Sequence, residues 1–341
     1  MQEVEKFFAI FSILRKKSAF FLYNPTFDLQ RSCGSGEIGR RTRLRIWRRK
    51  AWRFKSSLPH HFIYFFYDKI LNFDFNNIRQ SLKTILLTND DGFHSLGLLA
   101  LKEALKDIAR VVIVAPACEK SACGHGLTLS KPLKMIEIEK DFYKLDNGTP
   151  SDCIYLALHE FFQDKKPDLV ISGINLGSNM GEDITYSGTV AGAMEGAIYG
   201  IPSIAISQVL KNWEKEHHDF GLAKECISQI VRQIFDSTFP LQDRKLLNIN
   251  IPNLTSKECR GYKITQAGYR IYENSAQKSK NPRGQEYFWL GLHPLKWKER
   301  ENAQVPSDFQ AISEGYISLT PITLDLTSMQ DLQTLQKWIK Q

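Results

Sequence analysis

Two adjacent carboxylates, Asp90 and Asp91 in the string Thr88-Asn89-Asp90-Asp91-Gly92, are the residues best suited to chemistry. Neighbouring negative charges repel each other, and a cation between them removes that repulsion. Carboxylate, hydroxyl and amide oxygens suit hard cations such as Mg²⁺, Mn²⁺ and Ca²⁺. Ser121 and Asn175 supply the hydroxyl and the amide, so these four residues form a candidate metal site. The alternative is an ordinary Asx-rich turn, because Asp-Asp-Gly is also common turn chemistry.

Two other strings are candidates for binding an anion: the glycine-rich Ser172 to Gly181, and Ser187-Gly188-Thr189 before a helix of small residues. Glycine permits a positive φ and close backbone approach, and N–H groups at a helix start attract phosphate. The glycine-rich string lacks the Lys-Ser/Thr of a Walker loop and is not a dinucleotide fingerprint. A structural loop is the alternative for the first string, and helix capping is the alternative for the second.

Two further polar segments have less specific patterns. His125, between two glycines, is a candidate for stabilising a leaving group or for filling a turn. The string from Asn147 to Asp152 has turn chemistry and leads into a helix cap, beside the expected floor of the site. Among the cysteines only Cys118 and Cys123 are close together, which argues against a zinc ribbon and favours reduced thiols.

A regular alternation of strands and helices must position these polar strings. Apolar runs of strand type alternate with stretches of helical spacing, which predicts a Rossmann-like, doubly wound, mostly parallel α/β sheet. The expected strands are 84–88, 111–115, 169–172, 204–206 and 246–251, and the expected helices are 98–108, 152–162, 190–199 and 222–235. In open α/β sheets, ligands bind beyond the carboxyl ends of strands, so we expect the loops after 88, 115 and 172 to meet at one site.

The composition changes abruptly near residue 83. Residues 1–83 carry 17 Lys and Arg against 6 Asp and Glu, whereas the remaining residues carry 28 against 31. The high pI therefore gives no argument for nucleic-acid binding by the larger part. We expect a basic and aromatic extension, 1–83, followed by a main domain, 84–341. The main domain should have a core of about 84–255, a hairpin-rich extension of about 256–310 and a C-terminal return of about 311–341.

The basic run from Arg40 to Lys55 includes Trp47 and Trp52, which is typical of segments that contact nucleic-acid backbones and stack on bases. The alternatives are a disordered basic tail or an annotation artefact with the true start near residue 84, because Gly34 to Arg43 resembles a translated structural-RNA gene. A nucleic-acid partner is expected only if this segment exists in the native protein. No run approaches the ~20 apolar residues of a membrane span, so we expect a cytoplasmic protein with no membrane partner.

Taken together, the ordered strings resemble the SurE family (survival protein E) of metal-dependent 5′/3′-nucleotidases over about residues 84–325. Six strings carry the resemblance: 88–92, Ala115-Pro116 followed by Ser121, 147–150, 172–175, 186–189 and 315–321. Each string alone is weak, and their order and spacing make the set specific. The segment before residue 84 is absent from the family pattern.

The resemblance implies a Rossmann-like core, an extension exchanged between subunits, and a homodimer or homotetramer. It implies metal ligands at Asp90, Asp91, Ser121 and Asn175, with one divalent ion per subunit, Mg²⁺ or Mn²⁺. The implied reaction is hydrolysis of nucleoside 5′- and 3′-monophosphates. Its implied catalytic residues are Asn89, Asp90 and Asp91, and its phosphate-binding residues are Asn175, Ser187, Gly188 and Thr189. The rival hypotheses are an exopolyphosphatase acting on short chains and a non-catalytic nucleotide-binding module.

Overall fold

The computed structural model describes residues 83–210, 219–271, 276–290, 296–300 and 304–340. All of them belong to the second of the two units into which the chain divides, Phe75–Gln341. Apart from Lys83, the expected N-terminal extension lies outside the described residues, and so does the basic run from Arg40 to Lys55.

A nine-stranded mixed sheet forms the centre of the described unit, in the order β3-β4-β2-β1-β5-β6-β7-β13-β8. From β4 through β2, β1, β5 and β6 to β7, neighbouring strands run parallel. Strands β3 and β13 pair antiparallel with β4 and β7. The strands are β1 (Thr84–Thr88), β2 (Arg110–Pro116), β3 (Lys134–Glu139), β4 (Phe142–Asp146), β5 (Leu169–Leu176), β6 (Ser203–Gln208), β7 (Lys245–Ile251), β8 (Tyr262–Ile264) and β13 (Ile317–Thr323).

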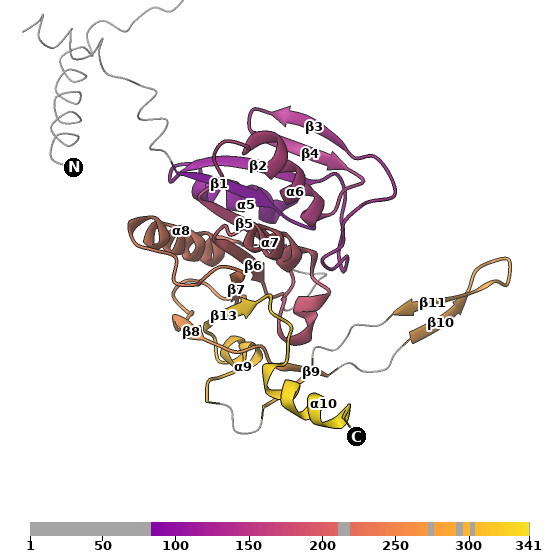
Figure 1. Cartoon of the computed structure of the whole chain (residues 1–341). Helices are drawn as coiled ribbons and strands as arrows, with labels where there is room; N and C mark the ends of the chain where they lie inside the picture. Colours follow the sequence, from indigo (N-terminus) through magenta and orange to yellow (C-terminus); the bar gives the residue numbers. More distant parts are fainter. Residues whose placement is uncertain (1–82, 211–218, 272–275, 291–295, 301–303, 341) are drawn as a thin grey trace, which may run out of the picture. The chain divides into compact units, whose positions relative to one another are not determined.

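Helices cover both faces of this sheet (Figure 1). They are α5 (Leu96–Leu105), α6 (Pro150–Phe161), α7 (Gly188–Ile198), α8 (Gly221–Asp236), α9 (Asp308–Ser313) and α10 (Leu332–Trp338), with short 3-10 helices η1 (Gly181–Thr185) and η2 (Met329–Asp331). The sheet divides the apolar core into two layers, and the side chains of strand β1 point alternately into each. Ile85 and Leu87 pack with side chains of α5 and α8, whereas Leu86 packs with side chains of α6. Burial on both faces explains why β1 is a continuous apolar run.

The predicted strands and helices are confirmed, with one correction at β5. The apolar run was expected to end at residue 172, but β5 continues to Leu176. Its register with β6 shifts between Ser172 and Asn175 and then resumes. Gly173 permits this path, because its φ is +138° and an added Cβ would lie 2.2 Å from the Ile206 carbonyl oxygen. Asn175 therefore lies in a strand end and not in a loop.

The segment expected to be a hairpin-rich extension contains two antiparallel strand pairs. They are β10 (Ala276–Lys280) with β11 (Glu286–Leu290), and β9 (Tyr269–Ile271) with β12 (Lys296–Lys298). The carboxylate of Asp308 accepts hydrogen bonds from the backbone N–H groups of Gly181 and Gly268, both at 2.9 Å. This buried side chain therefore joins the extension to the segment that follows β5.

Two expectations about the cellular environment bear on the described residues. None of the helices in the described ranges is long and apolar enough to cross a membrane. The described cysteines, Cys118, Cys123, Cys153, Cys226 and Cys259, all have free thiols.

Candidate metal and phosphate site

The predicted site lies where the winding of the sheet reverses. Strand β1 has β2 on one side and β5 on the other, so the loops after these strands diverge at their carboxyl ends. The structure brings three of the predicted segments together there. The backbone N–H of Lys120 donates to the Asp90 carbonyl oxygen at 2.7 Å. The backbone N–H of Leu176 lies 3.4 Å from Asp91 Oδ2.

The start of α7 forms the fourth side of the site and binds Asp90. The Thr189 hydroxyl donates a hydrogen bond to Asp90 Oδ1. Ser187 is the N-cap, and its Oγ accepts from the Val190 N–H at 3.0 Å. A Cβ added to Gly188 would lie 2.9 Å from Asp90 Oδ2, so glycine is what allows the carboxylate to approach the helix. The anion at this helix start is therefore a carboxylate of the same chain.

The two carboxylates are unusually costly to ionise. Asp90 is only 4% exposed, and burial raises its pKa although Thr189 and nearby backbone N–H groups oppose the rise. Burial, the charge of Asp90 and the charge of Glu119 raise the pKa of Asp91 to about 7. No ion pair in the described part of the chain includes Asp90 or Asp91 within 4.0 Å. A bound cation would remove this electrostatic cost.

Ser121 and Asn175 complete an oxygen-rich donor set that fits a divalent cation. The Ser121 hydroxyl donates to Glu119 Oε1 at 2.7 Å, which leaves its oxygen lone pairs for a ligand. The Asn175 side-chain N–H donates to the Gly177 carbonyl oxygen at 2.8 Å, which leaves the amide oxygen. No group of three or more His, Cys, Asp or Glu side chains in the described ranges is arranged to hold a metal. A cation here would therefore use hydroxyl and amide oxygens as well as the two carboxylates.

Asn89 shapes the loop that presents the two carboxylates. Its side chain is fully buried, and its amide N–H groups donate to the Gly92 carbonyl oxygen at 3.0 Å and to Ser95 Oγ at 2.7 Å. Both amide hydrogens are thus used within the loop. The amide oxygen of Asn89 is buried and has no hydrogen-bond partner in the described structure. This oxygen is the only group of the side chain left to interact with a ligand or water.

The structure also identifies site residues that the motifs did not single out. Glu119 accepts a hydrogen bond from the Ser121 hydroxyl. Cys123 lies against Gly188, because a Cβ added to Gly188 would be 2.9 Å from the Cys123 Sγ. Burial and the charge of Asp90 raise the pKa of the Cys123 thiol to about 11. The Glu195 carboxylate, which is only 7% exposed, lies 2.7 Å from the partly exposed ring of His125. The sequence contained a signal that could have identified Glu195, because it is the charged residue in a helix of otherwise small and apolar residues.

The string from Asn147 to Asp152 forms the helix cap that was predicted. Thr149 is the N-cap of α6, and Asp152 completes a capping box with it. The Thr149 hydroxyl also donates to the Gly126 carbonyl oxygen at 2.8 Å, and Asp152 Oδ1 accepts from the Thr128 N–H at 2.9 Å. The α6 cap therefore holds the far end of the loop that begins after β2.

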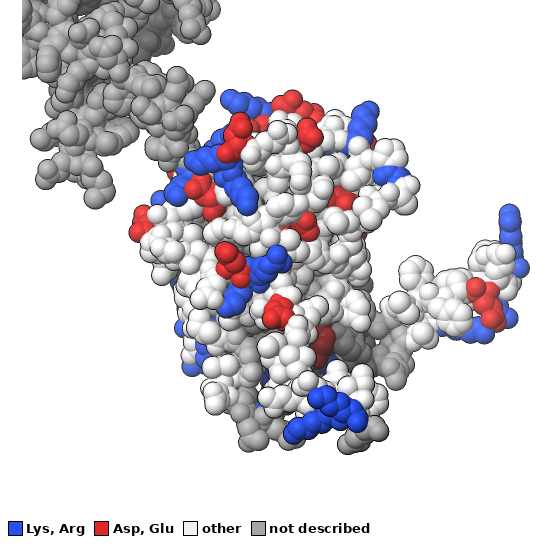
Figure 2. Space-filling model, viewed as in Figure 1, with Lys and Arg blue, Asp and Glu red and all other residues white. Residues whose placement is uncertain are grey.

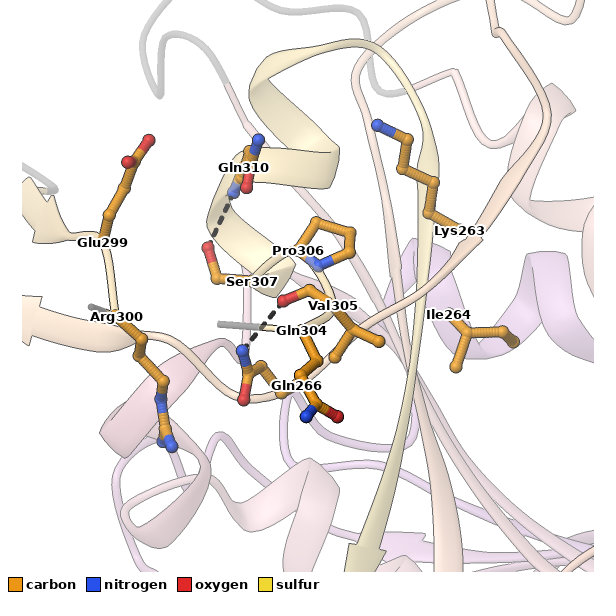
Figure 3. Close-up of a pocket in the computed structure, with 10 residues that line it drawn as sticks. All are labelled: Lys263, Ile264, Gln266, Glu299, Arg300, Gln304, Val305, Pro306, Ser307 and Gln310. Atoms are coloured by element: carbon orange, nitrogen blue, oxygen red, sulfur yellow. Dashed lines mark hydrogen bonds between the residues drawn. The ribbon is translucent and has the colours of Figure 1, made fainter. Parts of the chain in front are cut away.

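A cavity of about 630 Å³ lies elsewhere, in the C-terminal extension (Figure 3). It is lined by side chains from β8, the end of β12 and the start of α9, including Lys263, Arg300 and Gln310. Figure 3 shows hydrogen bonds between Gln266 and Val305 and between Ser307 and Gln310 at its wall. None of the predicted metal or phosphate residues lines it.

The surface of the described unit carries mixed charge. On the face shown in Figure 2, Lys and Arg side chains alternate with Asp and Glu side chains, without a broad area of one sign. This agrees with the near balance of charged residues after residue 83. The viewed face offers no continuous basic surface of the kind that binds a nucleic-acid backbone.

The fold and the candidate site define a class of protein: an α/β fold with an oxygen-rich set of side chains beside a helix start, at the point where the sheet reverses its winding. Comparison with known proteins identifies the family. Residues 85–274 match the family model described as "Survival protein SurE". The chain belongs to the SurE family.

Relatives extend the similarity over most of the chain. A protein of Helicobacter hepaticus named "5'-nucleotidase SurE" is 65% identical over 264 residues, which are 76% of this chain and 100% of the relative. A protein of the same name from Wolinella succinogenes is 60% identical over 259 residues, again 76% of this chain and 100% of the relative. The crystal structure of a SurE protein from Aquifex aeolicus is similar with a TM-score of 0.64 and 43% identity, covering 76% of this chain and 100% of that chain.

Proposed function

We propose that this protein is a metal-dependent phosphomonoesterase that hydrolyses nucleoside 5′- and 3′-monophosphates to nucleoside and phosphate. Relatives named 5'-nucleotidase SurE match this chain along their whole length, which supports the activity. The structural observation that carries the proposal is the pair Asp90 and Asp91. Both carboxylates have raised pKa values and no cationic side chain within ion-pair distance among the described residues.

The cation-binding residues are Asp90, Asp91, Ser121 and Asn175, and the ion is Mg²⁺ or Mn²⁺ with one per subunit. All four supply oxygen, which is what these ions prefer. When bound, such an ion acts as a Lewis acid and a template for the phosphoryl group. Glu119 fixes the direction of the Ser121 hydroxyl, and Gly177 fixes the amide of Asn175. These contacts preorganise the donors before substrate arrives.

The phosphate lies beside the start of α7, against Asn175, Ser187, Gly188 and Thr189. Thr189 holds Asp90, while Gly188 keeps the space beside it free of a side chain. Asp90 is the carboxylate that orients the attacking water, because it lies against the helix start where the phosphate is expected. Asn89 acts by holding the turn of the Asp90-Asp91 loop through its two hydrogen bonds.

Phosphate release from AMP and GMP, measured with Mg²⁺, Mn²⁺, Ca²⁺ or EDTA, tests the proposal. Activity should need a divalent ion. Asp90→Asn should abolish turnover while circular dichroism and melting temperature show an intact fold. A variant that remains active would rule out this role for Asp90. Nucleotide binding without phosphate release would instead indicate a binding module, and faster release from short polyphosphate would indicate an exopolyphosphatase.

We also propose a homodimer or homotetramer in the cytoplasm. Apolar side chains on β11 and α10 remain exposed in the single chain: Phe288 is 61%, Trp289 62% and Trp338 67% exposed. Such groups on a hairpin and a terminal helix are typical of surfaces that a second subunit covers. Light scattering coupled to size-exclusion chromatography measures the state directly. A monomer at micromolar concentration would contradict the proposal.

A further inference from the structure

We propose that Glu195 is a positioning residue for the nucleotidase reaction, acting through His125 to hold the Ser121 loop in its cation-binding position. The loop is residues 120–128, between β2 and β3. The inference rests on the proposed role of Ser121 as a cation ligand. It assigns His125 to the architecture of the site and not to protonation of the leaving group.

The first observation is the burial of a carboxylate within a small-residue helix. The Glu195 side chain is only 7% exposed, and its Oε2 lies 2.7 Å from Nε2 of His125. A buried carboxylate costs several kcal/mol of desolvation unless it is paired and hydrogen-bonded. Glu195 lies on the same helix as Thr189, which bonds Asp90. The pair therefore fixes the loop to the element that also fixes the catalytic carboxylate.

The second observation is the distribution of the other contacts that hold the loop. At its start, the Lys120 N–H donates to the Asp90 carbonyl oxygen at 2.7 Å. In its middle, the Gly124 N–H donates to the Tyr186 carbonyl oxygen at 2.9 Å. At its far end, the Gly126 carbonyl accepts from Thr149 at 2.8 Å. These contacts are made by the loop backbone, whereas His125 is anchored by its side chain.

The third observation is the exposure of Ser121 itself. Ser121 lies on the surface, and its hydroxyl donates a hydrogen bond to Glu119, two residues earlier in the chain. A contact this local does not fix the loop relative to β1 and β5. The position of the Ser121 hydroxyl relative to Asp90 and Asp91 therefore depends on anchors elsewhere in the loop. The contact between His125 and the buried Glu195 carboxylate is a side-chain anchor that joins this loop to α7.

The expected effect is a loss of cation affinity with the chemical step preserved. Residues that orient metal ligands from outside the coordination shell typically change affinity by roughly 10–100-fold. His125→Ala and Glu195→Ala should each weaken Mn²⁺ binding by about that factor, and saturating Mn²⁺ should restore kcat to within a few-fold of wild type. The double variant should be no worse than either single variant, because both remove one interaction.

Mn²⁺ binding to the full-length protein, measured by electron paramagnetic resonance without substrate, gives the primary result. His159→Ala is the matched control, because His159 also forms a hydrogen bond, 2.7 Å to the Tyr155 carbonyl oxygen, but lies on the exposed side of α6. Glu195→Gln keeps an oxygen acceptor and should retain most of the affinity. Unchanged Mn²⁺ affinity in His125→Ala would overturn the proposal, as would equal losses in Glu195→Gln and Glu195→Ala.

Two substrates distinguish positioning from leaving-group protonation. AMP has a poor alkoxide leaving group, whereas 4-nitrophenyl phosphate has a good one that needs no acid. Positioning predicts equal losses for both substrates in His125→Ala, and recovery of both with added Mn²⁺. A loss confined to AMP that persists at saturating Mn²⁺ would assign His125 as the acid and overturn the proposal. If wild type binds Mn²⁺ but hydrolyses neither substrate, the proposed function fails, while the affinity test still decides the role of Glu195.

Discussion

The hydroxyl of Thr189 donates a hydrogen bond to the carboxylate of Asp90, and this contact joins the first turn of α7 to the loop after β1. A helix start is commonly viewed as a place where phosphate binds directly. In this protein the helix start stabilises a carboxylate of the same chain. The proposed phosphate site and the proposed cation site thereby share one buried side chain, Asp90.

Thr189→Val should therefore weaken cation binding without a large change in shape. Valine fills a similar volume but cannot donate to Asp90, and the contact that lowers the pKa of Asp90 is lost. Hydrogen bonds to charged groups contribute about 1.5–3 kcal/mol. We expect Mn²⁺ affinity to fall about tenfold or more at neutral pH and to recover as pH rises. Thr185→Val, which removes an exposed hydroxyl bonded to the Glu182 carbonyl oxygen, is the control.

Gly188→Ala should abolish activity by crowding Asp90. A Cβ at this position would lie 2.8 Å from Asp90 Cβ and 2.9 Å from Cys123 Sγ, closer than such contacts allow. Alanine otherwise favours a helix by about 0.5–1 kcal/mol relative to glycine. Gly221→Ala is a matched control, because Gly221 also begins a helix and faces only an exposed aspartate oxygen at 3.1 Å. AMP turnover and melting temperature should be lowered in the first variant and preserved in the second.

Much of the core was predictable because its elements are buried on both faces. The apolar runs that became β1 and β2 have no competing pattern, and their carboxyl ends placed Asp90 and Ser121 in the correct loops. Strands β3 and β4 were not predicted, because β3 is a largely exposed edge strand whose charged residues hide its periodicity. The extension of β5 to Leu176 was not predicted, because a glycine at position 173 is typical of the end of a strand.

The partners of the site residues could not be predicted from sequence, for a physical reason. His125 and Glu195 are separated by 70 positions, and their pairing depends on how α7 packs beside the loop after β2. No local pattern encodes such a distance. Asn89 illustrates the same limit, because the resemblance implied a catalytic role but gave no partners, whereas the structure shows both of its amide hydrogens used within its own loop.

Asp308→Asn should loosen the extension from the core. Asp308 accepts from the N–H groups of Gly181, Gly268 and Phe309, each at 2.9 Å, and an amide nitrogen would face at least one of these donors. An unsatisfied buried donor costs about 1–3 kcal/mol. Urea unfolding should show that loss, and Asp325→Asn, at an exposed aspartate that accepts from the Thr327 N–H, should not. Equal stabilities of the two variants would contradict this role of Asp308.

The metal-free protein should become less stable as pH rises from about 4 to about 7, because the pKa of Asp91 is raised in the folded state. The folded pKa of Asp91, about 7, exceeds the usual aspartate value of 3.8, so within this window the folded state keeps a proton that the unfolded state has lost. The free energy of unfolding therefore falls with pH by about 1.4 kcal/mol per pH unit for this group. Below the window both states are protonated, and above it the penalty is constant. Asp91→Asn should remove this slope in EDTA.

Cation binding should favour the ionised form of Asp91, because the ion binds the ionised carboxylate. Affinity for the cation should therefore increase with pH, whereas the stability of the metal-free protein decreases. Through Asp91 alone, Mn²⁺ affinity should then rise about tenfold per pH unit up to about pH 7, and Asp90, whose pKa is also raised, adds to this rise. Urea unfolding in EDTA at pH 5, 6 and 7, together with calorimetric titration of Mn²⁺ at the same pH values, measures both effects. Asp107→Asn, at an exposed position after α5, should leave both slopes unchanged. A wild-type affinity for Mn²⁺ that is independent of pH between 5 and 7 would show that Asp91 is already ionised before the cation binds.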